Sequence, residues 1–328
     1  MNRDCTIGVL VPTNGAMPTT PPQARPIGRA ALVLASRGID VIFGDTASNG
    51  CMSGHRAVAD GWEAVNDVPV HGVHDRYPSQ LRSTQWMALQ AGLVGIPMGN
   101  PINFTMFCRD KLVCQARLEQ HGIRMPAVEG DANLFEARIH EWKNAFLKPR
   151  FGALGIGVRH VQEGDQLSAR CQGVIPDKPD PAILQQAVPP PAGWAGRSIR
   201  VLIQKTPDGG WFHGVPVVRQ SRDDFVVNAA RGADIAPGSQ ILAPSMIETI
   251  STEVDRICAA LDQLTEAHNM VEAGIDLVMD NEKNVWLIEV NSRPRGRLEL
   301  LANTQPNAYQ DLHVEVCARP IEVLASRT

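Results

Sequence analysis

Short apolar runs and helically spaced segments alternate along the first hundred residues of the chain. Apolar runs at residues 6–12 and 40–44 predict two strands, and the apolar spacing of residues 26–37 predicts a helix between them. A strand, a helix and a strand at this spacing predict a parallel βαβ unit. The same periodicity predicts further helices over residues 80–91 and 105–120. The chain is therefore expected to open with an α/β domain.

The pattern becomes rich in strands after Gly122. Short apolar runs, with few helical segments between them, predict strands at residues 146–149, 157–161, 183–188, 198–204 and 211–220. The clearest helix of the chain follows them. Ser245 and Glu248 have the spacing of a capping box, and apolar residues recur every three or four positions from Ile247 to Leu264. A hairpin pattern comes next, with apolar runs on both sides of a polar turn at residues 280–284.

The hairpin places acidic residues in register. If its turn is symmetric about Glu282 and Lys283, Asp276 lies directly opposite Glu289. Side chains alternate along a strand and directly opposed residues share a face, so Asn291 joins the two carboxylates. Two carboxylates and an amide are hard oxygen ligands that suit Mg²⁺. The sequence therefore predicts a magnesium site on this hairpin, provided that no bulge shifts the register.

The alternative is that Asp276 and Glu289 are solvated residues of an ordinary hairpin. Two observations weigh against it. Opposed carboxylates repel each other unless a cation lies between them. The apolar neighbours Ile275, Leu277 and Leu287 also indicate central rather than exposed strands.

A glycine-rich segment follows one predicted strand. The residues FLKPRFGALGIGV carry Lys148 at the strand end and then Gly152, Gly155 and Gly157. Glycines let backbone N–H groups approach an anion closely, and a lysine adds positive charge. The spacing excludes a Walker loop and a Rossmann fingerprint, and a strand rather than a helix follows. A phosphate-covering loop between two strands and a plain glycine-rich hairpin both remain open.

Composition narrows the class of protein. The 328 residues carry 31 Lys and Arg against 35 Asp and Glu, a net charge of −4, which does not favour nucleic-acid or membrane-surface binding. No apolar run is long enough to span a membrane. The 7 cysteines form no CxxC pair, which favours a reducing cytoplasm over a disulfide framework.

Taken together, these segments resemble the ATP-grasp superfamily of carboxylate–amine ligases, in the branch of glutathione synthetase and related peptide and amino-acid ligases. The resemblance rests on RDKLVCQARLEQHGIRMP, LKPRFGALGIGV, AILQQAVPP, GIDLVMD and WLIEVNSRP, in this order along the chain. It implies an α/β and α+β protein, with a pre-ATP-grasp α/β domain at residues 1–105 and an ATP-grasp domain at 106–328. Within the second domain, a lid-like subdomain at about 123–188 and a metal and substrate subdomain at about 189–328 are expected.

The resemblance also implies roles for individual residues. Lys111 and Lys148 would reach the nucleotide phosphates. Those expected at the ATP site are Lys111, Lys148, Gly152, Gly155, Gly157 and, at the hinge beside the adenine, Gln186, Ala187 and Val188. Those expected to hold Mg²⁺, with Mn²⁺ as an alternative metal, are Asp276, Glu289 and Asn291. The hinge lacks the acidic residue often found there in the family, so no ribose contact is assigned.

Several basic residues fall where the family places charge near the reacting groups. Arg200, Arg219 and Asn228 are assigned to catalysis, with Arg231 as a weaker candidate. Surface positions on strands are the alternative for these arginines. Arg293 and Arg295 stand where the family commonly has small residues and glycine. Because arginine binds carboxylates with two parallel donors, we expect one of them to hold a substrate carboxylate.

The residues after the predicted N-terminal strands are further candidates. The segment from His74 to Tyr77 is expected to line the cleft, and the loop at residues 12–23 is expected either to touch substrate or to be a surface loop.

The implied reaction is ATP-dependent amide formation through an acyl phosphate, with release of ADP and phosphate. The partners are small-molecule carboxylates and amines, such as amino acids or small peptides. Two alternatives stay open: an ATP-grasp enzyme that cyclises or phosphorylates its substrate, and an ATP-binding protein without catalysis. The substrates and the oligomeric state, a homo-oligomer included, are not decided by the sequence.

Overall fold

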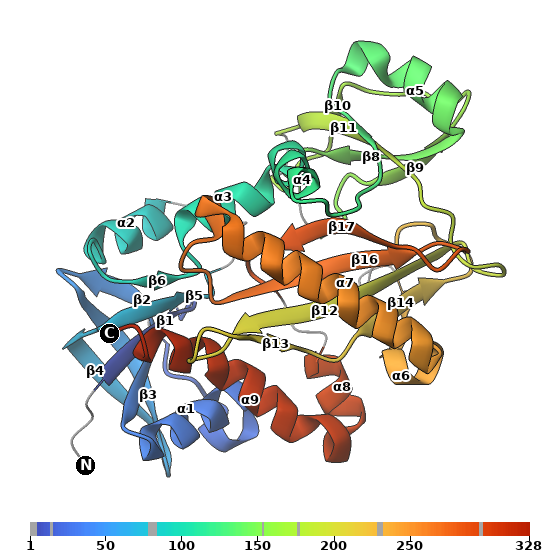
Figure 1. The fold of residues 1–328 in the computed structure, drawn as a ribbon. Coiled ribbons are helices and arrows are strands. Elements are labelled where there is room, and N and C mark those ends of the chain that lie inside the picture. Colours follow the sequence, from blue (N-terminus) through green and yellow to red (C-terminus); the bar gives the residue numbers. More distant parts are fainter. Residues whose placement is uncertain are drawn as a thin grey trace.

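The computed structural model describes residues 5–13, 16–77, 84–152, 154–175, 178–227, 232–294 and 298–328. Three β-sheets, each with helices packed against it, follow one another along the chain (Figure 1). The chain is thus a mixed α/β and α+β protein, as the sequence predicts. Within the described residues, no helix has both the length and the apolar character that a membrane crossing requires.

The first sheet has the strand order β4-β3-β2-β1-β5-β6. Its strands are β1 (Cys5–Leu10), β2 (Ile39–Ser48), β3 (Cys51–Val58), β4 (Gly61–Pro69), β5 (Gly72–Asp75) and β6 (Met98–Gly99). β1 and β2 are parallel and are joined through α1 (Pro26–Ser36), which confirms the predicted βαβ unit. The antiparallel strands β3 and β4 extend the sheet beyond β2 and have no counterpart in the sequence prediction.

Both ends of the chain contribute to the core of this sheet. α9 (Pro306–Ala325) lies beside α1 and β1, as the adjacent red and blue ribbons show (Figure 1). Ile321 and Leu324 of α9 are buried in one cluster with Ile7 and Val9 of β1. The last helix therefore closes the face of the first sheet.

The predicted helix at 105–120 is wrong in one respect, because the chain forms two helices there. α3 (Ile102–Arg109) ends before Asp110, and α4 (Lys111–Gln120) begins after it. The Asp110 carboxylate accepts from the backbone N–H groups of Leu112 (3.2 Å) and Val113 (3.4 Å), so it caps the second helix. α2 (Thr84–Gly92) covers the described part of the predicted 80–91 helix and ends one residue later, and residues 78–83 lie outside the described residues.

The second sheet has the order β10-β11-β8-β9, with β7 paired to β11. Its strands are β7 (Val128–Glu129), β8 (Asn144–Pro149), β9 (Arg159–Gln162), β10 (Arg170–Cys171) and β11 (Asp180–Gln186). Phe135 and Ile139 of α5 (Phe135–Trp142) are buried against this sheet together with Leu147 and Leu184. We call this unit the lid.

The third sheet has the order β15-β14-β12-β16-β17, with β13 paired to β12. Its strands are β12 (Gly196–Lys205), β13 (Trp211–His213), β14 (Val217–Ser221), β15 (Asp234–Pro237), β16 (Glu272–Met279) and β17 (Val285–Asn291). The single strand predicted at 211–220 is therefore wrong. Gly214 and Pro216 interrupt it, because proline cannot donate to a strand ladder and β13 and β14 lie at different places along β12.

The long helix α7 (Pro244–Gln263) covers one face of the third sheet (Figure 1). Its predicted apolar stripe is confirmed, since Ile250, Val254, Ile257 and Leu261 are buried in the core. The predicted capping box is wrong: the helix begins at Pro244, and no side chain caps its first turn. Shorter helices are α6 (Gly238–Ile241) and α8 (Leu298–Thr304).

Candidate active site

A cavity of about 1080 Å³ lies between the lid and the third sheet. Side chains from β8, β11, β12, β16 and β17 line it, and the segments after β5 and β17 close its other end. This volume suits a nucleotide together with a small second ligand. We call it the central cavity.

The hairpin of β16 and β17 places Asp276 opposite Glu289, as predicted, but by a different route. The turn is symmetric about Glu282 alone, because Met279 pairs with Val285. A bulge after Leu287 then leaves Ile288 without a partner and restores the predicted pairing. The bulge also turns both Ile288 and Glu289 towards the central cavity.

Two arginines of neighbouring strands hold the Asp276 carboxylate. Arg200 of β12 binds it with two donors, Nε at 2.7 Å and Nη2 at 2.5 Å, and Nη2 of Arg219 on β14 binds the same oxygen as Nε of Arg200. Burial alone would raise the pKa of Asp276, but the two guanidinium groups outweigh it and hold this pKa well below its usual range. The carboxylate is therefore ionised throughout the neutral range.

Asn291 joins this group from the end of β17. Its Nδ2 lies 3.1 Å from Asp276 Oδ2 and 3.1 Å from Glu289 Oε1. The three side chains that the sequence assigns to a metal thus converge within hydrogen-bond distance. The negative charge of the two carboxylates is partly balanced by Arg200 and Arg219.

Two lysines, the buried Lys148 and the half-buried Lys111, line the cavity beside this group. Lys148 on β8 donates to Gln185 Oε1 at 2.6 Å, and Lys111 at the start of α4 donates to the Gly152 carbonyl at 2.6 Å. Burial lowers the pKa of Lys148 to about 8, with the charge of Lys111 adding to the effect and Glu289 and Asp276 opposing it. Burial also lowers the pKa of Lys111, and Glu289 offsets part of this. Two destabilised ammonium groups side by side favour an incoming polyanion.

Comparisons with known proteins agree with this geometry. The family described as YheC/D-like ATP-grasp matches residues 165–316. In structure, the chain is similar to the VanG D-Ala:D-Ser ligase of Enterococcus faecalis, with a TM-score of 0.61 and 13% identity over 98% of this chain and 99% of that chain. It is also similar to the D-alanine–D-alanine ligase of Coxiella burnetii, with a TM-score of 0.60 and 15% identity over 99% and 95% of the two chains.

A D-cycloserine synthetase gives a TM-score of 0.61 at 14% identity over 98% of this chain and 99% of that chain. No curated protein matches the sequence.

The chain has the ATP-grasp fold.

ATP and Mg²⁺ are the cofactors of ATP-grasp ligases, and the residues present fit both. No group of three or more His, Cys, Asp or Glu side chains that could hold a metal occurs in the part of the chain that the structure describes. The group beside the arginines has two carboxylates and one amide. A divalent ion there would take oxygens from Glu289, Asp276 and the Asn291 amide, and would complete its shell with phosphate and water. A half-turn of the amide brings its oxygen to the position that Nδ2 occupies. Mg²⁺ commonly keeps such a mixed shell.

The three glycines of the loop between β8 and β9 have different surroundings. Gly152 and Gly155 line the central cavity. Gly157 is not among the residues that line it: this glycine has a φ of 71°, and a Cβ there would meet the Gln172 carbonyl oxygen at 2.3 Å. It serves a turn on the far side of the loop, where only glycine fits.

The hinge residues Gln186, Ala187 and Val188 lie at the end of β11 and line the cavity. The backbone N–H of Ala187 donates to the Asn144 carbonyl at 3.1 Å. The hinge is thereby fixed to the start of β8, and its position beside the cavity is set by the lid sheet.

The predicted substrate arginine Arg293 also lines the cavity, from the segment after β17. Its Nη2 donates to Asp75, and its guanidinium carbon lies 6.0 Å from the centre of the Trp86 ring. Of the segment His74–Tyr77, Arg76 and Tyr77 line the cavity. The described residues of the 12–23 loop are not among the lining residues. Asn228, Arg231 and Arg295 lie outside the described residues.

Sequence reasoning missed an aromatic group at the lid side. The rings of His160 on β9 and Phe225, after β14, stack with centroids 3.9 Å apart, and Phe146 meets His160 edge to face at 5.4 Å. All three line the cavity. Phe146 lies two residues before Lys148 on β8. The two-residue period of a strand could therefore have placed both side chains on the same face.

Proposed function

We propose that this chain is an ATP- and Mg²⁺-dependent ligase that joins a carboxylate to an amine and releases ADP and phosphate. One observation carries the proposal: Asp276, Glu289 and Asn291 converge beside Arg200 and Arg219 in a single cavity. This group can hold a metal-bound polyphosphate and an anionic substrate side by side. The names of two structural relatives, a D-alanine–D-alanine ligase and a D-Ala:D-Ser ligase, support an amino acid or small peptide as substrate.

The nucleotide would lie between the lid and the third sheet. Lys111 and Lys148 would bind its phosphates, Gly152 and Gly155 would cover them, and Gln186–Val188 would meet the adenine. Glu289, Asn291 and Asp276 would hold Mg²⁺, which neutralises phosphate charge when bound. Lys148, Asp276, Glu289 and Asn291 lie on strands and Lys111 starts a helix, which limits the reorganisation needed on binding.

The reaction divides into two balanced steps. A carboxylate oxygen of the acid substrate attacks the γ-phosphorus and ADP leaves, which gives an acyl phosphate. The amine nitrogen then attacks the acyl carbon, phosphate leaves and the nitrogen loses a proton. Here the protein contributes position and charge rather than covalent chemistry.

Arg219 is the residue best placed to follow the transferred group. It is buried, it lines the cavity, and its Nε has no hydrogen-bond partner in the described part of the chain. An unpaired buried donor of this kind costs about 1–3 kcal/mol unless a ligand accepts from it. We assign Arg219 and Arg200 to stabilising the anionic oxygens of the phosphoryl group and of the attacking carboxylate.

Product analysis tests the proposal. The purified protein is incubated with Mg²⁺-ATP and a matrix of amino acids, dipeptides and small acids, and products are weighed by mass spectrometry. A product equal to acid plus amine minus water, formed with one ADP each, is expected. A cyclised or phosphorylated product would identify the alternative enzyme activities. ATP binding without turnover across the matrix would favour a protein without catalysis.

A further inference from the structure

One end of the central cavity is built from the ends of two strands in different sheets. Arg76 and Tyr77 follow β5 of the first sheet, and Ser292 and Arg293 follow β17 of the third. Arg76 binds Glu272, which precedes Asp276 by four residues on β16. Four strand residues from Glu272 to Asp276 span about 13 Å, and the two residues from Asn291 to Arg293 span about 7 Å, so this end lies within one small-molecule length of the metal group. We call it the distal end.

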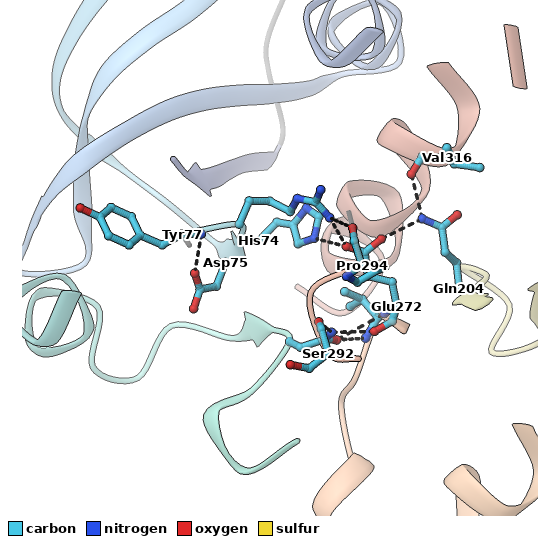
Figure 2. Close-up of polar contacts among 11 residues, drawn as sticks. His74, Asp75, Tyr77, Gln204, Glu272, Ser292, Pro294 and Val316 are labelled. Carbon is cyan, nitrogen blue, oxygen red and sulfur yellow. Dashed lines mark hydrogen bonds and ion pairs between the residues drawn. The ribbon is translucent and has the colours of Figure 1, made fainter. Parts of the chain in front are cut away.

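The two arginines of the distal end are held by buried carboxylates through reciprocal contacts. Arg293 donates to Asp75, the residue before Arg76. Arg76 Nη1 donates to Glu272 at 2.6 Å and to the carbonyl of Pro294, the residue after Arg293, at 3.2 Å. Figure 2 shows Asp75 beside Tyr77, whose backbone N–H it accepts, and Glu272 beside Pro294. Both guanidinium groups are therefore fixed before any ligand arrives.

The distal end also contains donors without acceptors. Arg293 Nε and Nη1 are buried and find no partner in the described part of the chain. The side chain of Arg293 lines the cavity. Such donors are costly when empty and favour a ligand with acceptor oxygens. Because Asp75 and Glu272 already neutralise part of the arginine charge, a singly charged carboxylate fits better than a doubly charged phosphate.

The charge of the whole cavity points the same way. Among the described residues, eight Lys and Arg side chains line it against the two carboxylates of Asp276 and Glu289. Mg²⁺ cancels about half of the charge of bound ATP, and the reacting carboxylate adds a single negative charge. Positive charge is thus left over among the lining residues. At the distal end Asp75 and Glu272 balance the two arginines, so the unpaired donors of Arg293 rather than net charge favour a ligand there.

We propose that the distal end is a subsite for a substrate carboxylate that the reaction does not consume, bound by Arg293 and Arg76. The proposal rests on the proposed ligase function and narrows its substrates. At least one of them is an amino acid or a dicarboxylic acid, with its reacting group at Arg200 and Arg219 and its free carboxylate at Arg293.

A binding measurement tests the subsite without turnover. The full chain, loaded with Mg²⁺ and a non-hydrolysable ATP analogue, is titrated calorimetrically with amino acids, dicarboxylic acids and the carboxamide of each. At least one acid should bind, and its carboxamide should bind about 10- to 100-fold more weakly. Arg293→Gln should weaken the acid by a similar factor and change the carboxamide little. Absence of a preference for the free carboxylate in every pair would overturn the subsite.

Two further variants keep the result interpretable. Arg293→Lys retains a charge beside Asp75, so it should fold even if Arg293→Gln does not, and it should still lose most of the preference because it lacks the arginine fork. Arg197→Gln removes another cavity arginine, one that contacts Gln220 and no carboxylate, and it should keep the preference. Loss of the preference in Arg197→Gln to the same degree would contradict a subsite at Arg293.

Turnover of the same pairs separates this inference from the ligase itself. One set of substrates has the carboxylate of the amine substrate blocked, and another has the second carboxylate of the acid substrate blocked. The blocked form that loses kcat/KM identifies the carboxylate that occupies the distal end. Equal kcat/KM for free and blocked forms would keep the ligase and reject the subsite. Carboxylate-dependent binding without ADP formation from any pair would keep the subsite and reject the ligase.

Discussion

At the scale of single residues, the site contains charged side chains whose burial is unfavourable unless a partner of opposite charge is present. Lys148 is fully enclosed, and burial brings its pKa down to about 8, near enough to neutral that its charge varies over an ordinary pH range. Asp276 is enclosed as well, but Arg200 and Arg219 keep it ionised. The cavity therefore combines a fixed anion with a lysine whose charge depends on pH and on what is bound.

The Lys148 pKa gives a prediction for nucleotide binding. Only the ammonium form of Lys148 binds phosphate. The affinity for Mg²⁺-ATP is therefore highest below the pKa of Lys148 in the free protein, and it falls as pH rises through about 8. Between pH 7 and 9 the Kd of Mg²⁺-ATP should rise about tenfold, measured by calorimetry at constant ionic strength. Lys148→Arg, which stays charged, should bind with little change over the same range. An equal pH dependence in both proteins would show that another group titrates.

At the scale of elements, the structure departs from the sequence prediction where tertiary contacts decide. The hydrophobic pattern is sufficient for α1 and α7, because each helix buries one face, and for β1 and the hairpin, because their strands read as short apolar runs. The break between α3 and α4 depends on Asp110, which Arg150 binds from the end of β8 at 2.8 and 2.7 Å. Arg150 lies 40 residues from Asp110 in the sequence, so the local sequence pattern does not predict this contact.

The hairpin of β16 and β17 shows how a correct strand pairing can follow from an incorrect premise. The assumed turn symmetry is off by one residue, and the bulge at Ile288 shifts the pairing back by one. A bulge is invisible to a strict two-residue period, since Ile288 reads as an ordinary apolar strand residue. The distal end was only partly predictable, because its arginines meet through strand ends of different sheets. Arg76 was foreseen only as one residue of a segment expected to line the cleft.

The Asp110 cap gives a prediction at this scale. Asp110→Ala removes the cap of α4 and the partner of Arg150, and so loosens the turn that positions Lys111. The free energy of unfolding should fall by about 1–2 kcal/mol in urea denaturation, and the Kd of Mg²⁺-ATP should rise. Asp131→Ala, which removes a cap in the lid away from the lysines, is the matched control and should leave the Kd unchanged. Equal effects of both variants on the Kd would contradict a positioning role.

At the scale of the whole molecule, one carboxylate connects the first sheet, the third sheet and the last helix. The Glu272 carboxylate accepts from Arg76, from His74 at 3.2 Å and from Gln204 at 3.1 Å. The same amide nitrogen of Gln204 also donates to the Val316 carbonyl of α9. Figure 2 shows Glu272 with His74 on one side and Gln204 on the other. Burial would raise the pKa of Glu272, but Arg76 and His74 bring it down to about 2.

This connection should appear in the acid stability of the chain. The pKa of Glu272 is lower in the folded state, so its contribution is present above its ordinary pKa of 4.5 and is lost as pH falls towards about 2. Glu272→Gln should reduce the free energy of unfolding by about 3 kcal/mol at pH 7, and by progressively less below pH 4.5. Glu63→Gln, at an exposed ion pair with Arg56, should cost less than about 1 kcal/mol. A pH-independent difference between wild type and Glu272→Gln would contradict the assignment.

The central claim is that the group around Glu289 binds metal and nucleotide for phosphoryl transfer to a carboxylate. It is tested most directly by quantifying the nucleotide product of the wild type, Glu289→Gln and the turn variant Glu282→Gln with Mg²⁺-ATP and the substrate matrix. We expect the wild type and Glu282→Gln to form ADP and phosphate only when acid, amine and Mg²⁺ are all present. Glu289→Gln should lose at least about 100-fold in kcat/KM. AMP in place of ADP, or full activity of Glu289→Gln, would contradict the account.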